Sequence, residues 1–167
     1  MRKQKGFSLI ELLIVVAIIL IIAAIAIPNL LRARIAANES AAASGIRTIN
    51  TGEVSYNSTY PTVGYSATLA NLGPGGAAAS CPTPPTSTSS CVIDGVLAAG
   101  TKQGYRYTYN QGAGGPPAVA YTISASAVQQ NQSGVRAFCS FEDAVVRFQA
   151  AGPFAGNCDG TVTVLGQ

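Results

Sequence analysis

The stretch GFSLIELLIVVAIILIIAAIAIPNLL, residues 6–31, decides the fold. Nothing polar interrupts it between residues 12 and 27, and Ser8 and Glu11 are the only polar residues between Gly6 and that run. As a helix rising about 1.5 Å per residue, the stretch is long enough to cross a hydrocarbon core of about 30 Å. The sequence therefore predicts an N-terminal helix that can span a membrane.

The charges of the chain are unevenly distributed around this stretch. Of the ten Lys and Arg residues, Arg2, Lys3 and Lys5 precede Gly6. By the positive-inside bias they favour a cytoplasmic N-terminus and an external remainder. Without residues 1–6, basic and acidic side chains balance, so the charge pattern indicates no binding of nucleic acid.

Two simpler interpretations of the apolar stretch compete. A secretory signal peptide has an apolar centre of about 7 to 15 residues and then a small-residue cleavage site. Here the run is longer, and a helical pattern continues beyond it. A plain single-span anchor fits the length but leaves Glu11 unexplained, because an acidic residue near a helix centre costs about 2.5 to 3.5 kcal/mol on insertion scales.

The segment KGFSLIELLIVVAIILIIAAIAIPNL resembles the N-terminus of type IV prepilins and of the related type II secretion pseudopilins. The resemblance implies a leader of residues 1–6, cut after Gly6 by a dedicated peptidase, and N-methylation of the new first residue, Phe7. It also implies that Glu11 pairs with the N-terminal amine of a neighbouring subunit. The alternative, that Glu11 only extends toward the cytoplasmic face, stays open.

The helix is predicted to run from Phe7 to Asn57, in two parts. Residues 7–28 form the transmembrane or filament-core part, and residues 29–57 form an amphipathic part whose apolar positions follow a 3.5 to 3.6 residue repeat. Pro28 removes one helical hydrogen bond, which predicts a kink or a melted turn there. The stripe is interrupted at Asn38 and Glu53; its members are Leu31, Ile35, Ala42, Ile46, Ile49 and Tyr56, of which the last three are expected to pack on the protein's own sheet.

Residues 58–167 are predicted to form a globular head domain. Runs typical of strands occupy residues 104–110, 120–128, 135–141 and 144–149, with a turn at Glu142 and Asp143, and residues 162–165 are a candidate last strand. Residues 72–91 are poor in core-forming side chains and are predicted to be an exposed loop. The expected fold is α+β, with the second half of the helix packed on an antiparallel sheet, as the resemblance to pilins also implies.

The four cysteines are typical of an exported domain, because neither spacing matches a metal knuckle or a redox C-x-x-C pair. Pairing each cysteine with its sequence neighbour is favoured among three connectivities: Cys81 with Cys91, and Cys139 with Cys158. The resemblance supports the second pair, since pilins carry a disulfide near the C-terminus. The first pair departs from the commonest pilin plan.

Catalytic and metal-binding signals are weak. The chain has no histidine, no nucleophile motif and no phosphate loop, so neither an enzyme nor a cofactor is expected. Glu142, Asp143 and Asp159 are candidate calcium ligands, but they lack regular ligand spacing. They are expected to be solvated turn residues.

The function that the resemblance implies is assembly. As a type IV pilin-like subunit, the chain would enter the inner membrane as a single-pass prepilin, contact lipid there, and polymerise with copies of itself into a surface filament for motility, adhesion or DNA uptake. Its implied partners are the prepilin peptidase and an assembly ATPase acting through an inner-membrane platform protein. The alternatives are a type II secretion pseudopilin and a membrane-anchored binding domain that never polymerises.

Overall fold

A computed structural model describes residues 8–75, 80–112, 114–154 and 158–166. The chain divides into two compact units, Met1–Arg34 and Ile35–Gln167. Helix α1 (Leu9–Thr59) is the only regular element among the described residues of the first unit, and it continues into the second. The predicted helix is thus confirmed to within two residues at its C-terminal end, while Phe7 lies outside the described residues.

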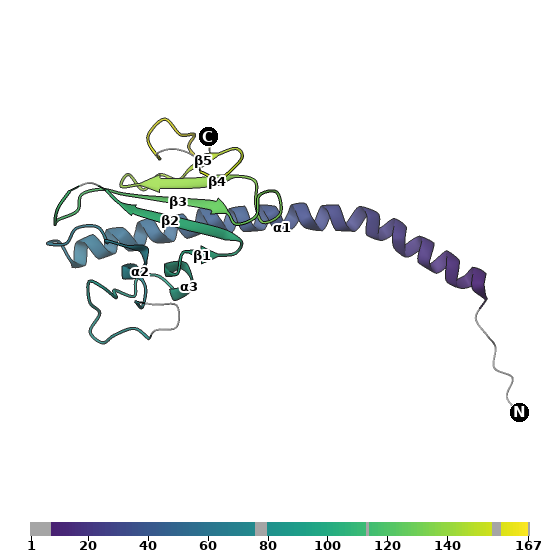
Figure 1. The fold of residues 1–167 in the computed structure, drawn as a ribbon, viewed down its shortest axis with the longest axis horizontal. Helices are drawn as coiled ribbons and strands as arrows, with labels where there is room; N and C mark the ends of the chain where they lie inside the picture. The colour runs from purple at the N-terminus through teal and green to yellow at the C-terminus, as the bar shows by residue number, and fades with distance from the viewer. Residues whose placement is uncertain (1–7, 76–79, 113, 155–157, 167) are drawn as a thin grey trace, which may run out of the picture. The chain divides into compact units, whose positions relative to one another are not determined.

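The second unit is built around a meander of five antiparallel strands in the order β1-β2-β3-β4-β5. The α1 residues of this unit lie along the sheet, with the short helices α2 and α3 nearby (Figure 1). The fold is therefore α+β, as predicted. The bounds of these elements are α2 (Leu69–Leu72), α3 (Gly95–Ala98), β1 (Thr101–Lys102), β2 (Tyr105–Gln111), β3 (Tyr121–Ala127), β4 (Ala137–Phe141) and β5 (Arg147–Gln149).

Alternation along the central strands builds the core between α1 and the sheet. In β2 the side chains of Tyr105 and Tyr107 are buried, whereas Arg106 between them is exposed. The register pairs Tyr107 with Ala125 and Ala125 with Phe138, so one face of three strands is apolar. The predicted stripe of α1 meets this face, and its members Ala42, Ile46, Ile49 and Tyr56 are all at most 1% exposed.

Two of the expected strands differ from the structure. The run at residues 144–149 is paired only from Arg147, because Ala144 adopts a positive φ of 59° and the Asp143 carboxylate binds the Val145 N–H, which extends the turn. Residues 162–165 form a single bridge between Val164 and Arg147 rather than a strand.

The predicted exposed loop at residues 72–91 is only partly exposed. Its first residue, Leu72, is fully buried in the core, and Ser90 is also buried. The Tyr56 hydroxyl donates a hydrogen bond to the Ser87 carbonyl at 2.6 Å, which ties the loop to α1. Leu72 is buried because it is the last residue of the short helix α2, which was not predicted and which also buries Leu69.

The predicted cysteine pairing is confirmed. Disulfides join Cys81 to Cys91 and Cys139 to Cys158, with Cα–Cα distances of 5.9 Å in both. Cys139 lies on the central part of β4 and is fully buried. The second disulfide therefore fixes the C-terminal segment to the sheet, whereas the first closes a surface loop.

Three buried polar side chains of α1 connect the helix to the rest of the second unit. Asn50 donates to Ser140 Oγ and to the Ala144 carbonyl, and its side-chain oxygen accepts from the Tyr121 hydroxyl. Glu39 accepts three hydrogen bonds from a loop of the sheet, and Glu53 accepts two from Ser66. Periodicity gave Glu53 only as an interruption of the apolar stripe and gave Glu39 no partner, so neither contact was predicted.

The two buried carboxylates of α1 respond to their surroundings in opposite ways. Burial raises the pKa of Glu53, and the hydrogen bonds from Ser66 only partly offset this. Burial also acts to raise the pKa of Glu39, but the Arg136 and Val135 N–H groups and the Arg136 guanidinium outweigh it and lower that pKa. Ionisation of Glu53 therefore opposes folding, while ionisation of Glu39 favours it.

The raised pKa of Glu53 predicts a specific pH dependence of stability. A group whose pKa is raised on folding contributes most to the stability of the folded state at pH values below its unfolded pKa, near 4.5. That contribution to stability is lost as the pH rises through the pKa of the folded state. We compare the free energy of unfolding of Glu53→Gln with that of the wild type at each pH. We expect the difference, variant minus wild type, to increase from pH 4.5 to pH 8. Unfolding of the full chain in detergent, followed by tyrosine circular dichroism, measures it. A difference that does not change with pH would contradict the prediction.

Candidate functional site

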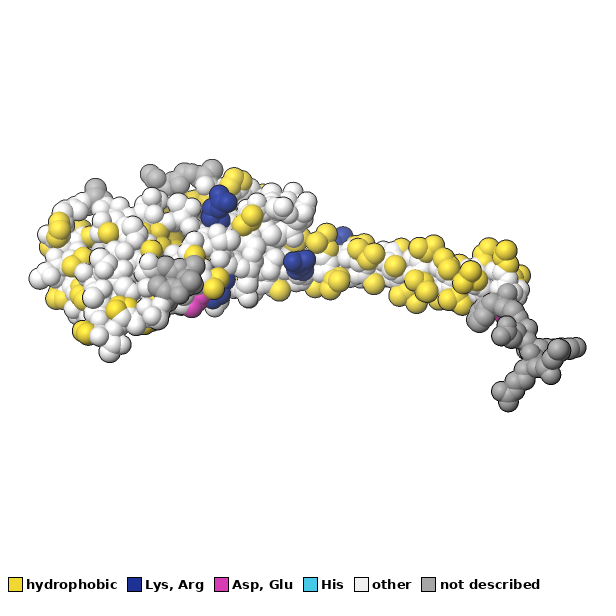
Figure 2. Space-filling view, turned by 60° about the horizontal axis from the view of Figure 1, so that its bottom comes forward, with side chains coloured by type: hydrophobic (Ala, Val, Ile, Leu, Met, Phe, Trp, Pro, Cys, Tyr) yellow, Lys and Arg dark blue, Asp and Glu magenta, His cyan; other side chains and the backbone are white. Residues whose placement is uncertain are grey.

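The first part of α1 presents a continuous apolar surface. From Leu9 to Leu31 every residue except Ala23 is exposed, and the large aliphatic side chains are 45% to 79% exposed. Figure 2 shows hydrophobic side chains covering this stretch of the helix. By length and composition α1 is the one helix among the described residues that is able to cross a membrane. So large an apolar surface requires cover, because soluble monomers rarely expose apolar patches beyond a few hundred Å².

A local contact sets the beginning of α1. The backbone N–H of Ser8 donates to Glu11 Oε2 at 2.9 Å, and the Leu12 N–H donates to the Ser8 carbonyl. This is one half of a capping box, in which an acidic residue three positions into the helix binds back to the N-cap backbone. The S-x-x-E spacing at residues 8–11 is the sequence signal for this contact, and it was not among the predictions above. Glu11 thus has a structural contact within its own chain.

Of the other residues predicted for the N-terminal site, the structure describes Pro28 but not the two at the cleavage position. Gly6 and Phe7, the predicted cleavage and methylation positions, lie outside the described residues. Pro28 lies inside α1, and helix is assigned on both sides of it, so the alternative of a melted turn is wrong. A kink at Pro28 stays a prediction.

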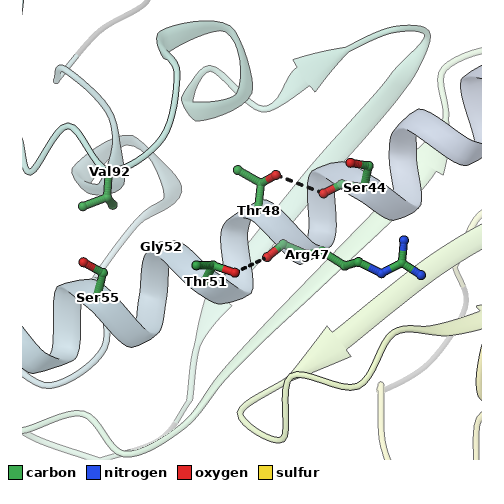
Figure 3. Close-up of a pocket in the computed structure, with 7 residues that line it drawn as sticks. All are labelled: Ser44, Arg47, Thr48, Thr51, Gly52, Ser55 and Val92. Atoms are coloured by element: carbon green, nitrogen blue, oxygen red, sulfur yellow. Dashed lines mark hydrogen bonds between the residues drawn. The ribbon is translucent and has the colours of Figure 1, made fainter.

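The second unit carries a shallow hollow along α1, beside Val92 (Figure 3). The Thr48 hydroxyl donates to the Ser44 carbonyl at 3.1 Å, and the Thr51 hydroxyl donates to the Arg47 carbonyl at 3.0 Å. These hydroxyls are therefore engaged within the helix. The lining contains no carboxylate, thiol or imidazole, so it offers no acid–base pair; its members are Ser44, Arg47, Thr48, Thr51, Gly52, Ser55 and Val92.

The three candidate calcium ligands do not form a site: two of them bind other side chains, and the third is exposed in a turn. Asp143 forms an ion pair with Arg147 at 2.6 Å, and Asp159 accepts hydrogen bonds from Thr161. Glu142 is exposed in the turn between β4 and β5. Among the described residues, no group of three His, Cys, Asp or Glu side chains is able to hold a metal ion.

Comparisons with known proteins concern the N-terminal segment. Residues 1–27 match the family described as the prokaryotic N-terminal methylation motif. A Thermus thermophilus protein named type IV wide pilus major component PilA4 is 68% identical over 40 residues, or 24% of this chain and 30% of that protein. A Myxococcus xanthus protein named type IV major pilin protein PilA is 45% identical over 54 residues, or 32% of this chain and 24% of that protein.

These matches confirm the resemblance inferred from the sequence. The chain is type IV pilin-like, with the methylation motif at its N-terminus and disulfides in its second unit. Both relatives are named as components of pili, which are structural proteins rather than enzymes. The matched segments cover less than a third of either relative's length.

Proposed function

We propose that this chain is the structural subunit of a type IV pilus. The precursor is inserted in the bacterial inner membrane with its N-terminus in the cytoplasm, is cut after Gly6 and is N-methylated at Phe7. The mature chain then polymerises into a surface filament. One observation carries the proposal: the methylation motif at residues 1–27 includes most of the exposed apolar surface that runs from Leu9 to Leu31.

The physical argument concerns how that surface is covered. A large aliphatic side chain gains about 1.5 to 3 kcal/mol when it is fully removed from water. More than a dozen such side chains are exposed on the segment, so water is a poor environment for it. The bilayer covers the segment before assembly, and the same segment of neighbouring copies covers it in the filament. The names of the two relatives, both major pilus components, support self-assembly.

The proposed partners follow from these steps. Cleavage after Gly6 requires the prepilin peptidase, and extraction from the membrane requires an assembly ATPase acting through an inner-membrane platform protein. The alternative within the same class is a type II secretion pseudopilin, which shares the N-terminal motif. An anchored binding domain that never polymerises is disfavoured by the methylation motif.

Microscopy and mass spectrometry of the native chain test the proposal. Surface fractions sheared from cells should contain filaments that disappear when the gene is deleted. Their subunit should have the mass of a chain that begins at Phe7 and carries one methyl group. The matched variant Gly6→Val should keep the leader and yield no filaments, because the peptidase needs a small residue before the cut. Mature subunit that stays in the periplasm would favour the pseudopilin, and an uncut chain would favour the anchored domain.

A further inference from the structure

We propose that Arg32 and Arg34 bind the phosphates of anionic phospholipid headgroups at the outer face of the membrane and set the depth of the helix there. This inference rests on the proposed function, because it concerns the membrane-inserted subunit. It concerns the end of the span opposite to Gly6, Phe7 and Glu11. Neither arginine has a role in the cleavage, methylation or pairing described above.

The pairing of charges within the chain isolates these two residues. Three basic side chains are held by acids of the second unit: Lys102 by Asp94, Arg136 by Glu39 and Arg147 by Asp143. Within the part of the chain that the structure describes, four exposed arginines have no ion-pair partner, namely Arg32, Arg34, Arg47 and Arg106. The first two lie in the unit Met1–Arg34 and follow its apolar surface directly.

The length of the apolar surface places the arginines at headgroup level. Residues 9–31 extend about 35 Å along a helix, slightly more than a hydrocarbon core of about 30 Å. Arg32 and Arg34 therefore begin where the hydrocarbon ends, and their side chains reach several ångströms further. Long basic side chains at such a position keep their charge in the headgroup layer while their stems stay on apolar surface.

The angular spacing of the two residues favours a lipid layer over a single protein partner. Positions two apart on an α-helix are rotated by about 200°, so Arg32 and Arg34 point to nearly opposite sides. A protein docking on one face of the helix would meet only one of them. Headgroups surround the helix, so both guanidinium groups have phosphate oxygens within reach. The planar guanidinium also binds phosphate through two parallel hydrogen bonds.

Removal of the leader makes the contact of Arg32 and Arg34 with phosphates more important for holding the helix in the membrane. The only other basic side chains of the first unit are Arg2, Lys3 and Lys5, all in residues 1–6. Once the leader is cut, Arg32 and Arg34 are the remaining side-chain cations of that unit. The processed helix is then held by phosphates at its outer end, on the side toward which a subunit must leave.

A tryptophan reporter tests the proposal, because the chain has no tryptophan of its own. Leu30 is 71% exposed, so Leu30→Trp places a fluorophore one turn before Arg34, on the same side of the helix. The full chain is reconstituted in vesicles of phosphatidylcholine and phosphatidylglycerol, with bromine on one lipid or the other. We expect brominated phosphatidylglycerol to compete for this position about fivefold better than brominated phosphatidylcholine, the preference expected for one basic residue near an anionic surface.

Variants and a second reporter separate the possible outcomes. Arg32→Gln with Arg34→Gln should remove the preference, whereas Arg47→Gln, another exposed and unpaired arginine, should keep it. Ile19→Trp, near the middle of the span, should be quenched equally by both lipids. Equal quenching at residue 30 in the parent chain, or a preference that survives the double substitution, would overturn the inference. If residue 19 is not quenched by deeply brominated lipid, the helix does not span and the proposed function fails instead.

Discussion

Glu11→Leu should leave the subunit inserted and processed while surface filaments fall to near zero. In this variant the new amine at Phe7 finds no carboxylate when copies pack, and an uncompensated buried charge costs about 3 to 5 kcal/mol. If Glu11 only extended toward the cytoplasm, the same change would remove a costly polar group and leave assembly unharmed. Filament counts by microscopy, beside an immunoblot for processed subunit in a strain expressing only the variant, measure the effect.

The hydrogen bond between Ser8 and Glu11 calls for a matched variant, Glu11→Gln. Glutamine keeps an oxygen that accepts the Ser8 N–H, and it also occurs at this capping-box position. Pairing with the amine needs the charge, so it predicts that Glu11→Gln fails to form filaments, as Glu11→Leu does. Capping alone, a contribution of about 1 kcal/mol, predicts near-normal filaments for Glu11→Gln. Normal filaments of processed Glu11→Leu subunit would contradict both roles.

The parts of the fold that were predictable from sequence depend on local repetition. The 3.6-residue spacing of Ile46, Ile49 and Tyr56 predicted the face of α1 that is buried, because helix geometry alone puts them on one side. The run at residues 104–110 was likewise predicted to be a strand, and in β2 Tyr105 and Tyr107 are buried while Arg106 between them is exposed. The short elements α2, α3 and β1 have too few residues to show any period, so they were missed.

The polar contacts of the core were not predictable, because they depend on residues far apart in the chain. Glu39 is buried by Val135 and Arg136, which lie 96 and 97 positions further on. Helical periodicity assigns a carboxylate to solvent unless a partner is known, and sequence alone did not provide the partner. Glu53 is similar, since Ser66 reaches it only through the turn that follows α1.

The candidate site also has a part that local sequence predicts and a part that only the structure shows. A motif at fixed spacing predicted roles for Gly6, Phe7 and Glu11, because the resemblance to prepilins lies in local sequence, and these roles stay predictions. No site was predicted at Arg32 and Arg34, because the sequence has as many acidic as basic residues after the leader. Only the structure shows that three of those acids form ion pairs with other basic residues of the second unit, and that the two arginines have no ion-pair partner among the described residues.

Glu39→Ala should lower the free energy of unfolding of the second unit by about 3 kcal/mol. The carboxylate accepts the N–H groups of Val135 and Arg136 at 2.9 and 3.0 Å, and the Arg136 Nε at 2.7 Å. Alanine leaves both backbone donors without their acceptor, at about 1 to 3 kcal/mol for each that stays buried. The side chain of Arg136 is 41% exposed, so water compensates most of the loss of its ion pair.

Two matched variants and a pH series make this prediction specific. Glu142→Ala removes an exposed carboxylate and should change stability by less than about 0.5 kcal/mol. Glu39→Gln keeps an acceptor oxygen but loses the charge, so it should fall between alanine and the wild type. Because the pKa of Glu39 is lowered on folding, its contribution is present above the unfolded value near 4.5 and is lost as the pH falls through the folded value. The deficit of Glu39→Ala, measured by unfolding of the full chain in detergent, should therefore shrink below pH 4.5. A deficit that matches Glu142→Ala at neutral pH would show that the loop holding Val135 and Arg136 is fixed by other contacts.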